Sequence, residues 1–419
     1  GARMQSIVQR LATPDRLAQA IDGNLCALDA ALDYQVKNGI HLFRISSDVI
    51  PFGSSPVNAL DWMRDFESHL AALGRKARCH RIRLSMHPGQ YTVLNSPDAD
   101  VVERAKLDLA YHAAFLDALE LDATAKIVLH VGGAYGDKPR ALERFASAYG
   151  ALSSAVRRRL VIENDDRLFT AQDVLALSRA TGAPVVFDIL HHELNHEPGA
   201  PDWRTLLDEA AATWGHEDGV QKMHYAQQAP GRRLGSHTDT IALGPFLAFH
   251  RELAEHRGAA GCAGATDGAN TAGLGMPDIM LEVKDKNLSA LKCILCTSER
   301  GCFTELEREW ARYKYAVLEH DQAAYLALRA LLKDKRAWPA IPFYETVERA
   351  LATPVDPGSF RNAAQHVWGY VSDHATPRER ASFERLLERD DRQAVKRKLR
   401  VLAEKYDQEY LLESYYFTR

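Results

Sequence analysis

The sequence predicts an α/β protein, a TIM-type (β/α)8 barrel with an uncertain first strand, followed by an all-helical C-terminal domain. Over the first two thirds of the chain, short apolar runs alternate with helical patterns, the order expected of βα units around a parallel sheet. After about residue 298 strand signals stop and helical periodicity continues. The length of 419 residues also exceeds the roughly 250 that such a barrel needs, so a second domain is expected.

Seven strands are predicted from β-branched or apolar runs. They cover residues 41–46, 83–86, 126–130, 160–163, 184–188, 221–224 and 279–282. A closed barrel needs an eighth strand, which should precede Leu25, where residues 5–10 are a weak candidate. Helices are predicted between the strands, including residues 25–35, 101–121, 140–149 and 171–180.

The predicted domains are a barrel over residues 1–298 and a helical domain over residues 299–419. Residues 257–277 are rich in Gly, Ala and Thr, a composition that buries too little apolar area to order itself, so they are predicted to be a flexible surface insertion. In the second domain, helical patterns cover residues 305–333, 361–374 and 377–417, with a weaker one within 338–357.

Charge and composition exclude several classes of protein. The 52 basic and 56 acidic residues leave a net charge of -4, so nucleic-acid binding would need a local basic patch or bound metal ions. No run approaches the roughly 18 apolar residues of a membrane span, and no signal-peptide pattern is visible. Six cysteines are too few for a disulfide framework. We therefore expect a cytoplasmic protein with no membrane partner, and a monomer.

Side chains of the metal-ligand type end or follow six of the seven predicted strands. They are His87, His130, Glu163, Asp188, His224 and Glu282. His191 and His237 lie in adjacent loops. The C-terminal ends of parallel barrel strands open on one face, where such barrels build active sites. One such residue is usually structural, but six at corresponding positions make coincidence a poor explanation. Mixed His and carboxylate ligation suits Zn or Mn and hydrolytic chemistry at two or three metals.

Lys222 precedes His224 by two positions on one strand, so both side chains should point to the same side. A lysine aimed into a metal pocket is unfavourable unless it is neutral, modified or in contact with a phosphate. The alternative is that strand irregularity turns Lys222 toward solvent or a carboxylate.

Residues 85–97, with the sequence SMHPGQYTVLNSP, resemble the signature of the UV damage endonuclease family. Further stretches resemble the same family, namely residues 43–48, 130–133, 135–138, 163–166, 185–188 with 191–192, and 280–286. The similarity is collinear from about residue 24 to residue 291. It implies a TIM barrel related to the endonuclease IV type that holds up to three divalent metals, with manganese the most common and Zn or Mg as alternatives.

The resemblance also implies a reaction and a set of site residues. Family members nick double-stranded DNA immediately 5′ of a pyrimidine photoproduct or another distorting lesion, with hydroxide activated by metal. The metal ligands implied here are His87, His130, Glu163, Asp188, His191, His224, His237 and Glu282. Glu163, Lys222 and Glu282 would be catalytic, Lys222 as a carboxylated lysine. Gln90 and Tyr91 would probe the lesion, which suits a planar pair in a strand-end loop, and Lys286 would contact a phosphate.

Two departures from the family pattern bear on the activity. Ser55 occupies the position at which relatives commonly carry a histidine, which affects the coordination of one metal. The family's opening strand, which contributes residues that reach toward DNA, is not recognisable before Asn24. Both departures bear on whether this chain keeps the family's substrate.

The C-terminal part resembles a helical domain of unknown function (YbgA-like) that is found fused to other proteins. The resembling stretches are residues 313–318, 362–370 and 410–417. A basic run lies nearby, with Arg392, Lys396, Arg397, Lys398 and Arg400. Such a run is usually a solvated helix face, and DNA contact is the alternative.

Cys293, Cys296 and Cys302 lie within ten residues at the predicted domain junction. Three thiolates could hold zinc or an iron–sulfur cluster if a fourth ligand came from elsewhere, but no second cysteine pair follows. Buried or surface thiols are therefore the favoured interpretation.

Two other classes of function stay open. Related barrels arrange Glu, Asp and His around one or two metals in sugar isomerases and epimerases, although these have no need of the additional histidines or of the Gln90–Tyr91 loop. The chain could also bind damaged DNA without cutting it.

Overall fold

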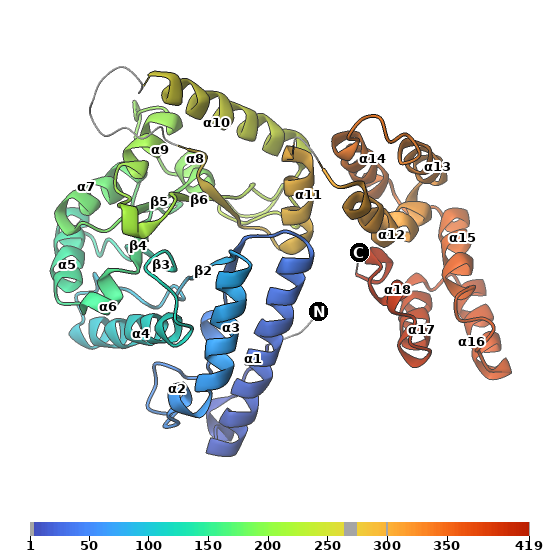
Figure 1. Cartoon of the computed structure of the whole chain (residues 1–419), viewed down its shortest axis with the longest axis horizontal. Coiled ribbons are helices and arrows are strands. Elements are labelled where there is room, and N and C mark those ends of the chain that lie inside the picture. The colour runs from blue at the N-terminus through green and yellow to red at the C-terminus, as the bar shows by residue number, and fades with distance from the viewer. Residues whose placement is uncertain (1–3, 264–274, 299–300, 419) are drawn as a thin grey trace. The chain divides into compact units, whose positions relative to one another are not determined.

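The computed structural model describes residues 4–263, 275–298 and 301–418. The chain divides into two compact units. The first comprises the chain up to Ile241 together with Ala248–Leu291, and the second comprises Ala242–Leu247 and the chain from Lys292 onward. Figure 1 shows both units along the chain.

The first unit is built on one parallel sheet with the strand order β1-β2-β3-β4-β5-β6-β7. Its strands are Leu42–Ile45, Arg83–Met86, Lys126–His130, Leu160–Glu163, Val185–Asp188, Lys222–Tyr225 and Asp278–Leu281. The edge strands β1 and β7 contact each other, so the sheet curls into a nearly closed barrel. The predicted parallel barrel and its seven strands are confirmed.

No described residue forms the predicted eighth strand. Residues 4–8 have no regular structure, and a short 3-10 turn at Gln9–Leu11 precedes helix α1, Pro14–Lys37. Thr13 caps α1, and Pro14 stands at its first position, where proline is pre-organised for a helix. The backbone of Gln5 bonds to the side chain of Asn24, donating to Oδ1 at 2.6 Å and accepting from Nδ2 at 3.2 Å. The side-chain amide of Asn24 thus makes the backbone hydrogen bonds with Gln5 that a neighbouring strand would otherwise make.

Helices connect the strands, and α1 and α3 lie side by side outside the sheet (Figure 1). The helices after α1 in this part of the chain are α2 Trp62–Asp65, α3 Glu67–Cys79, α4 Ala99–Ala118, α5 Lys138–Gly150, α6 Ser154–Arg157, α7 Ala171–Thr181, α8 Ile189–Leu194, α9 Trp203–Ala211, α10 Leu243–Ala263 and α11 Asn287–Thr297. Short 3-10 helices occur at Ser47–Val49 and His216–Asp218. No helix in the described residues is long and apolar enough to cross a membrane.

The insertion predicted at residues 257–277 starts within a helix of the structure, so its predicted start is too early. Helix α10 continues through residue 263, and the side chain of Arg257 is buried. Its Nη1 atom lies 2.9 Å from Asp208 Oδ1, and Nη2 donates to Gln221 Oε1 at 2.8 Å. These contacts anchor the end of the helix, which composition alone does not reveal. The rest of the predicted insertion lies largely in residues 264–274, outside the described residues.

Charged side chains fill the N-terminal end of the barrel. Arg83 reaches from β2 across to β6 and β7, where it donates to Val220 O at 2.5 Å and pairs with Asp278 at 2.7 Å. Lys126, at the start of β3, is fully buried and pairs with Asp218 at 2.5 Å. These pairs satisfy buried charges that would otherwise destabilise the fold, and the apolar strand residues pack beyond them.

The second unit is helical. Its helices are α12 Phe303–His320, α13 Gln322–Leu331, α14 Ala340–Ala352, α15 Pro357–Trp368, α16 Pro377–Glu388, α17 Arg392–Lys405 and α18 Glu409–Leu412, with a 3-10 turn at Tyr415–Phe417. The long pattern at residues 377–417 is broken into several elements because Asp390 and Asp407 adopt positive φ values of 52° and 50°. Asp321 similarly ends α12 and caps α13.

A buried polar network ties this unit together. Glu309 is fully buried and accepts hydrogen bonds from Arg312, Tyr344 and Tyr415 at 3.0 Å each. The network joins α12 to α14 and to the C-terminal turn. Around α15–α17, a separate apolar core includes Phe360, Val367, Phe383, Val395 and Leu399.

Candidate metal centre

The strand register brings the ligand-type side chains together. His130 on β3 is the direct neighbour of Glu163 on β4, and Asp188 on β5 is the direct neighbour of His224 on β6. His87 follows the last residue of β2. Because the sheet is parallel, these positions share the C-terminal face of the barrel, as the sequence predicted.

Glu163 is the centre of the cluster. Its Oε2 atom lies 3.1 Å from His87 Nε2 and 3.5 Å from His130 Nε2. Its Oε1 atom lies 2.6 Å from His224 Nδ1 and 4.0 Å from His191 Nδ1. With both oxygens facing different imidazoles, this carboxylate has the placement of a group that bridges two cations.

Two sets of side chains could each hold a metal ion. One is His87, His130 and Glu163, and the other is Glu163, Asp188 and His224; within each set the candidate ligand atoms lie within 4.8 Å of one another. Mixed imidazole and carboxylate donors are ligands for first-row divalent metals. Glu163 belongs to both sets.

Asn164 fixes the position of Asp188 and His191. Its side chain donates to Asp188 O and accepts from Asp188 N, both at 2.9 Å. The backbone oxygen of Asn164 bonds His191 Nδ1 at 2.9 Å, and Asp188 Oδ1 accepts from His191 N at 2.8 Å. The other oxygen, Asp188 Oδ2, is buried without a hydrogen-bond partner among the described residues, which leaves it available to a cation.

Glu282 lies one residue beyond β7 and completes the ring of side chains. Its Oε1 lies 3.4 Å from His224 Nδ1, and its Oε2 lies 3.7 Å from His237 Nδ1. Arg44 from β1 donates a hydrogen bond to Glu282 Oε1. Sequence reasoning missed Arg44 because a cation at a strand end is not a ligand-type residue, although it lies in one of the family-like stretches.

Burial and the charges of neighbouring groups shift the pKa values of the cluster residues. Burial opposes ionisation of Glu163, but His224 and His130 outweigh it and hold the Glu163 pKa well below its ordinary value. Burial also raises the pKa of Asp188 to about 7. For His191 burial acts in the opposite sense, yet Asp188 and Glu163 raise its pKa to about 9. The pocket therefore concentrates carboxylate charge that histidine protons and Arg44 balance, a charge distribution suited to divalent cations.

Lys222 and His224, which lie two positions apart on β6, are both buried. Its Nζ atom has no hydrogen-bond partner among the described residues. Burial, followed by the charge of Arg83, holds the Lys222 pKa well below its ordinary value. The side chain is not turned toward solvent, and it is the neutral amine that burial favours.

The three residues predicted to contact DNA are exposed, unlike most of the metal-ligand cluster. Gln90 and Tyr91 are exposed, with Tyr91 68% exposed, and Lys286 is exposed with a positive φ of 47°. The loop that carries Tyr91 is held from below, because Thr92 donates to Asp108 Oδ2 at 2.6 Å. Tyr91 is therefore presented outward rather than packed away.

Ser55 makes only local contacts among those described. Its amide bonds Phe52 O at 2.9 Å, and its hydroxyl accepts from Val57 N at 3.3 Å. The neighbouring Ser54 donates to Asp108 Oδ1 at 2.9 Å. Ser54, the residue before Ser55, thus ties the loop after β1 to α4.

The three junction cysteines do not form a candidate ligand group in the described part of the chain. Cys293 and Cys296 are buried in α11, and Cys302 is exposed at the N-cap of α12. Burial raises the pKa of Cys296 to about 12, which favours the thiol. Binding of zinc or an iron–sulfur cluster by these cysteines stays an untested prediction.

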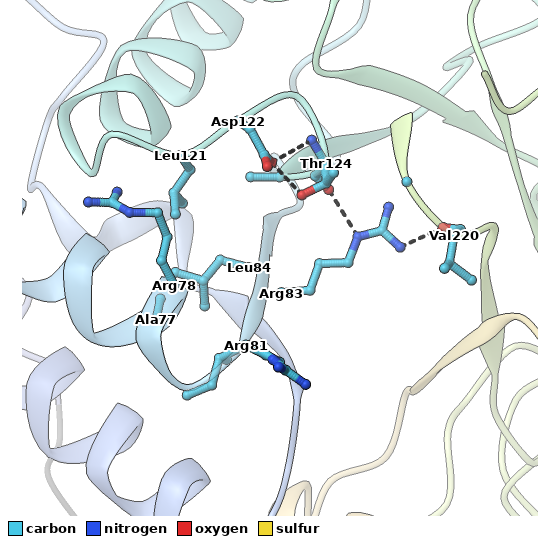
Figure 2. Close-up of a pocket in the computed structure, with 12 residues that line it drawn as sticks. Ala77, Arg78, Arg81, Arg83, Leu84, Leu121, Asp122, Thr124 and Val220 are labelled. Atoms are coloured by element: carbon cyan, nitrogen blue, oxygen red, sulfur yellow. Dashed lines mark hydrogen bonds between the residues drawn. The ribbon is translucent and has the colours of Figure 1, made fainter. Parts of the chain in front are cut away.

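A pocket lies at the opposite, N-terminal end of the strands and is lined by residues including Arg78, Arg81 and Arg83. Figure 2 shows Arg83 bonded to Thr124 and Val220. Arg78 is likewise held by Leu119 O and Glu120. Two of its three arginines are thus bonded within the fold, and none of the predicted site residues lines this pocket.

The fold and the cluster together define a parallel α/β barrel with a candidate metal centre at its C-terminal face. Residues 2–307 match the family model described as UV-endonuclease UvdE, and residues 314–419 match one described as a protein of unknown function, DUF1722. The chain belongs to the UV-endonuclease family, and its C-terminal part to the second family.

Individual relatives agree. The chain is 34% identical over 409 residues to a UV DNA damage endonuclease of Clostridium perfringens, covering 97% of this chain and 93% of the relative. A UV DNA damage endonuclease of Bacillus pumilus is 30% identical and matches 57% of this chain and 74% of its own. The crystal structure of SacUVDE superposes with a TM-score of 0.63 at 33% identity, over 73% of this chain and 95% of that one. The C. perfringens relative thus extends over both units.

Proposed function

We propose that the chain is a metal-dependent DNA repair endonuclease that nicks the phosphodiester 5′ of UV photoproducts or other distorting lesions in double-stranded DNA. Family membership supports the class of reaction. The observation that supports metal dependence is Glu163, whose two oxygens face separate groups of imidazoles. Asp188 Oδ2 supports it as well, because it is buried and has no hydrogen-bond partner among the described residues, and such an atom is costly without one.

The donor set fits divalent cations, with manganese as the first candidate and Zn or Mg as alternatives. The proposed ligands are His87, His130, Glu163, Asp188, His191, His224, His237 and Glu282. Up to three cations when bound would supply hydroxide near neutral pH and neutralise charge on the phosphate. No side-chain nucleophile is then required.

The protein's own residues position this chemistry. Asn164 holds Asp188 and His191 in place through both backbone and side chain. Arg44 holds Glu282 and places a cation at the rim of the cluster. Arginine at such a position suits an anionic phosphate, because its guanidinium matches the geometry of phosphate oxygens. Exposed Gln90 and Tyr91 are proposed to contact the lesion, and Lys286 a phosphate.

For Lys222 we propose carboxylation. The uncharged amine would attack carbon dioxide at its carbon, form an N–C bond and release one proton, giving an anionic carbamate. The charged groups that act on Lys222 most strongly are Arg83, Asp278 and Arg44, and two of these are cations that would stabilise an anion. This modification would convert an unpartnered buried amine into a carboxylate on the same strand as His224. Incorporation of ¹³C-bicarbonate, lost in Lys222→Ala, tests it.

The decisive experiment is incision of an end-labelled duplex with one defined photoproduct, with Mn²⁺ and with chelator. Undamaged and abasic duplexes are run beside it. The expected result is a nick just 5′ of the photoproduct that chelator abolishes and that Glu163→Ala lowers by at least about a hundred-fold, since several kcal/mol of metal stabilisation are lost.

The control is His196→Ala, which replaces an exposed histidine outside the cluster. It should cut like the unsubstituted protein. Full activity of Glu163→Ala would contradict the assignment. Binding without cutting, with metal present, would instead favour a damaged-DNA binding protein.

A further inference from the structure

The helical unit contains a partly exposed group of aromatic and basic side chains that the proposed incision does not use. It is formed by Lys314 on α12, Tyr315 beside it, Tyr370 after α15 and Tyr410 on α18, which we call the tyrosine–lysine cluster. Each of the three stretches that resemble the helical domain of unknown function contributes to it. Residues almost a hundred positions apart in the chain thus meet at one place on the surface of this unit.

The geometry of the cluster is specific. Lys314 Nζ lies 4.6 Å from the centroid of the Tyr315 ring and 4.7 Å from that of Tyr410. The rings of Tyr370 and Tyr410 stack with centroids 5.6 Å apart and planes 18° apart. Tyr315 is buried and donates to the Tyr370 hydroxyl at 3.0 Å. The buried tyrosine therefore fixes the outer pair in place.

The outer pair remains accessible. Tyr370 is 37% exposed and Tyr410 is 39% exposed, so part of each side chain is accessible to solvent. Arg380, another exposed cation, donates to Ser372 O at 3.2 Å in the turn that follows Tyr370. The contacts of Lys314 with Tyr410 and Tyr370 outweigh its burial and raise its pKa, so it carries a full positive charge at neutral pH.

We propose that the tyrosine–lysine cluster is a second nucleic-acid contact, which stacks an unpaired base on Tyr370 or Tyr410 and binds the adjacent phosphate through Lys314. Single-strand binding sites combine exposed aromatic faces with cations in this way, since every base has a π face and every link a charge. The acidic neighbours Asp373 and Glu409 limit the local positive field. The site therefore depends on stacking plus one cation and differs from a broad basic groove.

The chain's family supplies the reason to choose DNA as the occupant over a protein or a membrane. A protein that acts on DNA through its barrel gains affinity when a second contact holds the same polymer. The proposal does not require incision, so it is measured in chelator, where the proposed cleavage is absent.

Photo-crosslinking locates the contact directly. A short single strand containing 5-iododeoxyuridine is irradiated with the full-length protein in chelator, and the adducts are mapped by mass spectrometry. Adducts on Tyr370 or Tyr410 are expected, beside any on Tyr91. Adducts confined to the barrel would overturn the proposal.

Binding measurements supply the second arm. Tyr410→Ala and Tyr370→Ala should each weaken single-strand binding by about five-fold or more, because one stacked base contributes about 1–3 kcal/mol. Lys314→Gln should reduce the salt slope of binding by about 0.7, the value for one phosphate of a single strand, and Lys314→Arg should restore it. Leu326→Ala, at an exposed apolar position on α13, is the matched control.

Folding is checked by circular dichroism for each variant, because the cluster also joins α12, α18 and the turn after α15. Tyr370→Phe keeps the stacking ring but removes the hydroxyl that accepts from Tyr315, so it should lose less affinity than Tyr370→Ala. Unchanged affinity and salt slope in folded Tyr410→Ala and Lys314→Gln would refute the second contact, whether or not the barrel cuts damaged DNA.

Discussion

Arg44 on the first strand and Glu282 just after the last strand form an ion pair across the edges of the sheet. The two residues are 238 positions apart in the chain. Their contact links the edges of a seven-stranded sheet that has no eighth strand among the described residues to seal it. It also holds a proposed metal ligand in place.

Removing Arg44 should destabilise the metal-free barrel. Arg44→Met removes the arginine from the largely buried Glu282 carboxylate and leaves only its histidine neighbours His224 and His237. The loss should be about 1–2 kcal/mol, at the low end because Arg44 is itself 35% exposed. Mn²⁺ should reduce this loss, since a bound cation would compensate the same carboxylate. Urea unfolding with chelator and with Mn²⁺ measures both. An equal loss in the two conditions would show that Glu282 does not meet the metal.

Asp108 should matter for incision without contacting the metals. Its two oxygens bond Thr92 and Ser54, so Asp108→Ala frees the loops after β2 and β1. Displacement of a positioning group by about 1 Å can cost a hundred-fold in rate, and we expect a loss of about ten- to a hundred-fold on the photoproduct duplex.

Metal content measured by mass spectrometry should stay unchanged in Asp108→Ala, which separates a positioning role from loss of the cluster. Asp108→Asn retains an acceptor and a donor for the two hydroxyls and should recover most of the activity. Loss of metal together with activity would argue against the positioning role.

Metal binding should raise the thermal midpoint of the barrel. A ligand at a hundred times its dissociation constant stabilises the native state by about 2.7 kcal/mol, and chelator should reverse the shift. Asp188→Asn should shrink it, because a proposed ligand oxygen is replaced by an uncharged amide. His196→Ala should show the full shift. A shift of unchanged size in Asp188→Asn would remove that residue from the ligand set.

Glu379 should make the helical unit sensitive to acid. Its carboxylate accepts from Lys405 Nζ and Tyr406 OH at 2.8 Å and from Thr376 N at 2.9 Å, and these bonds, that of Lys405 foremost, hold its pKa well below the ordinary value. A depressed pKa means that the stabilisation is fully present above the unfolded value of about 4.3. It is lost as pH falls from there toward the folded pKa.

The difference in urea midpoint between the unsubstituted chain and Glu379→Gln should accordingly be largest near neutral pH and shrink as acid protonates Glu379. Glu384→Gln, an exposed position on the same helix, should show little difference at any pH. A constant difference for Glu379→Gln would mean that its charge is not the cause.

Gly74 allows α3 to approach the end of α4. A Cβ atom there would lie 1.7 Å from Leu119 O, so Gly74→Ala should destabilise the barrel by about 1–3 kcal/mol through overpacking, despite alanine's better helix propensity. Gly150→Ala in α5 meets nothing within 4 Å and should be neutral or slightly stabilising. Denaturant unfolding compares the two, and equal effects would contradict the close approach.

The strands and their ligand-bearing ends were predictable because a parallel sheet forces residues at corresponding strand ends onto one face. His130 and Glu163 are 33 positions apart, yet they are register neighbours. Arg44 was not predictable in this way, since its partner is specified by barrel closure and not by a local pattern. The insertion boundary was wrong because average composition does not show that Arg257 pairs with Asp208. The weak strand candidate at residues 5–10 forms no strand, and the side chain of Asn24 bonds the backbone of that segment.

Arg83 joins β2 to β7 and to the residues before β6 at the N-terminal end of the barrel, and beside it the buried Lys126 pairs with the partly exposed Asp218. Charged side chains therefore fill this end of the barrel, and the candidate ligands lie at the opposite ends of the strands. If DNA binds over Gln90 and Tyr91 as proposed, it would also cover the face from which cations reach the proposed ligands. Metal loaded before DNA should exchange slowly while the duplex is bound, and the order of addition becomes part of the reaction.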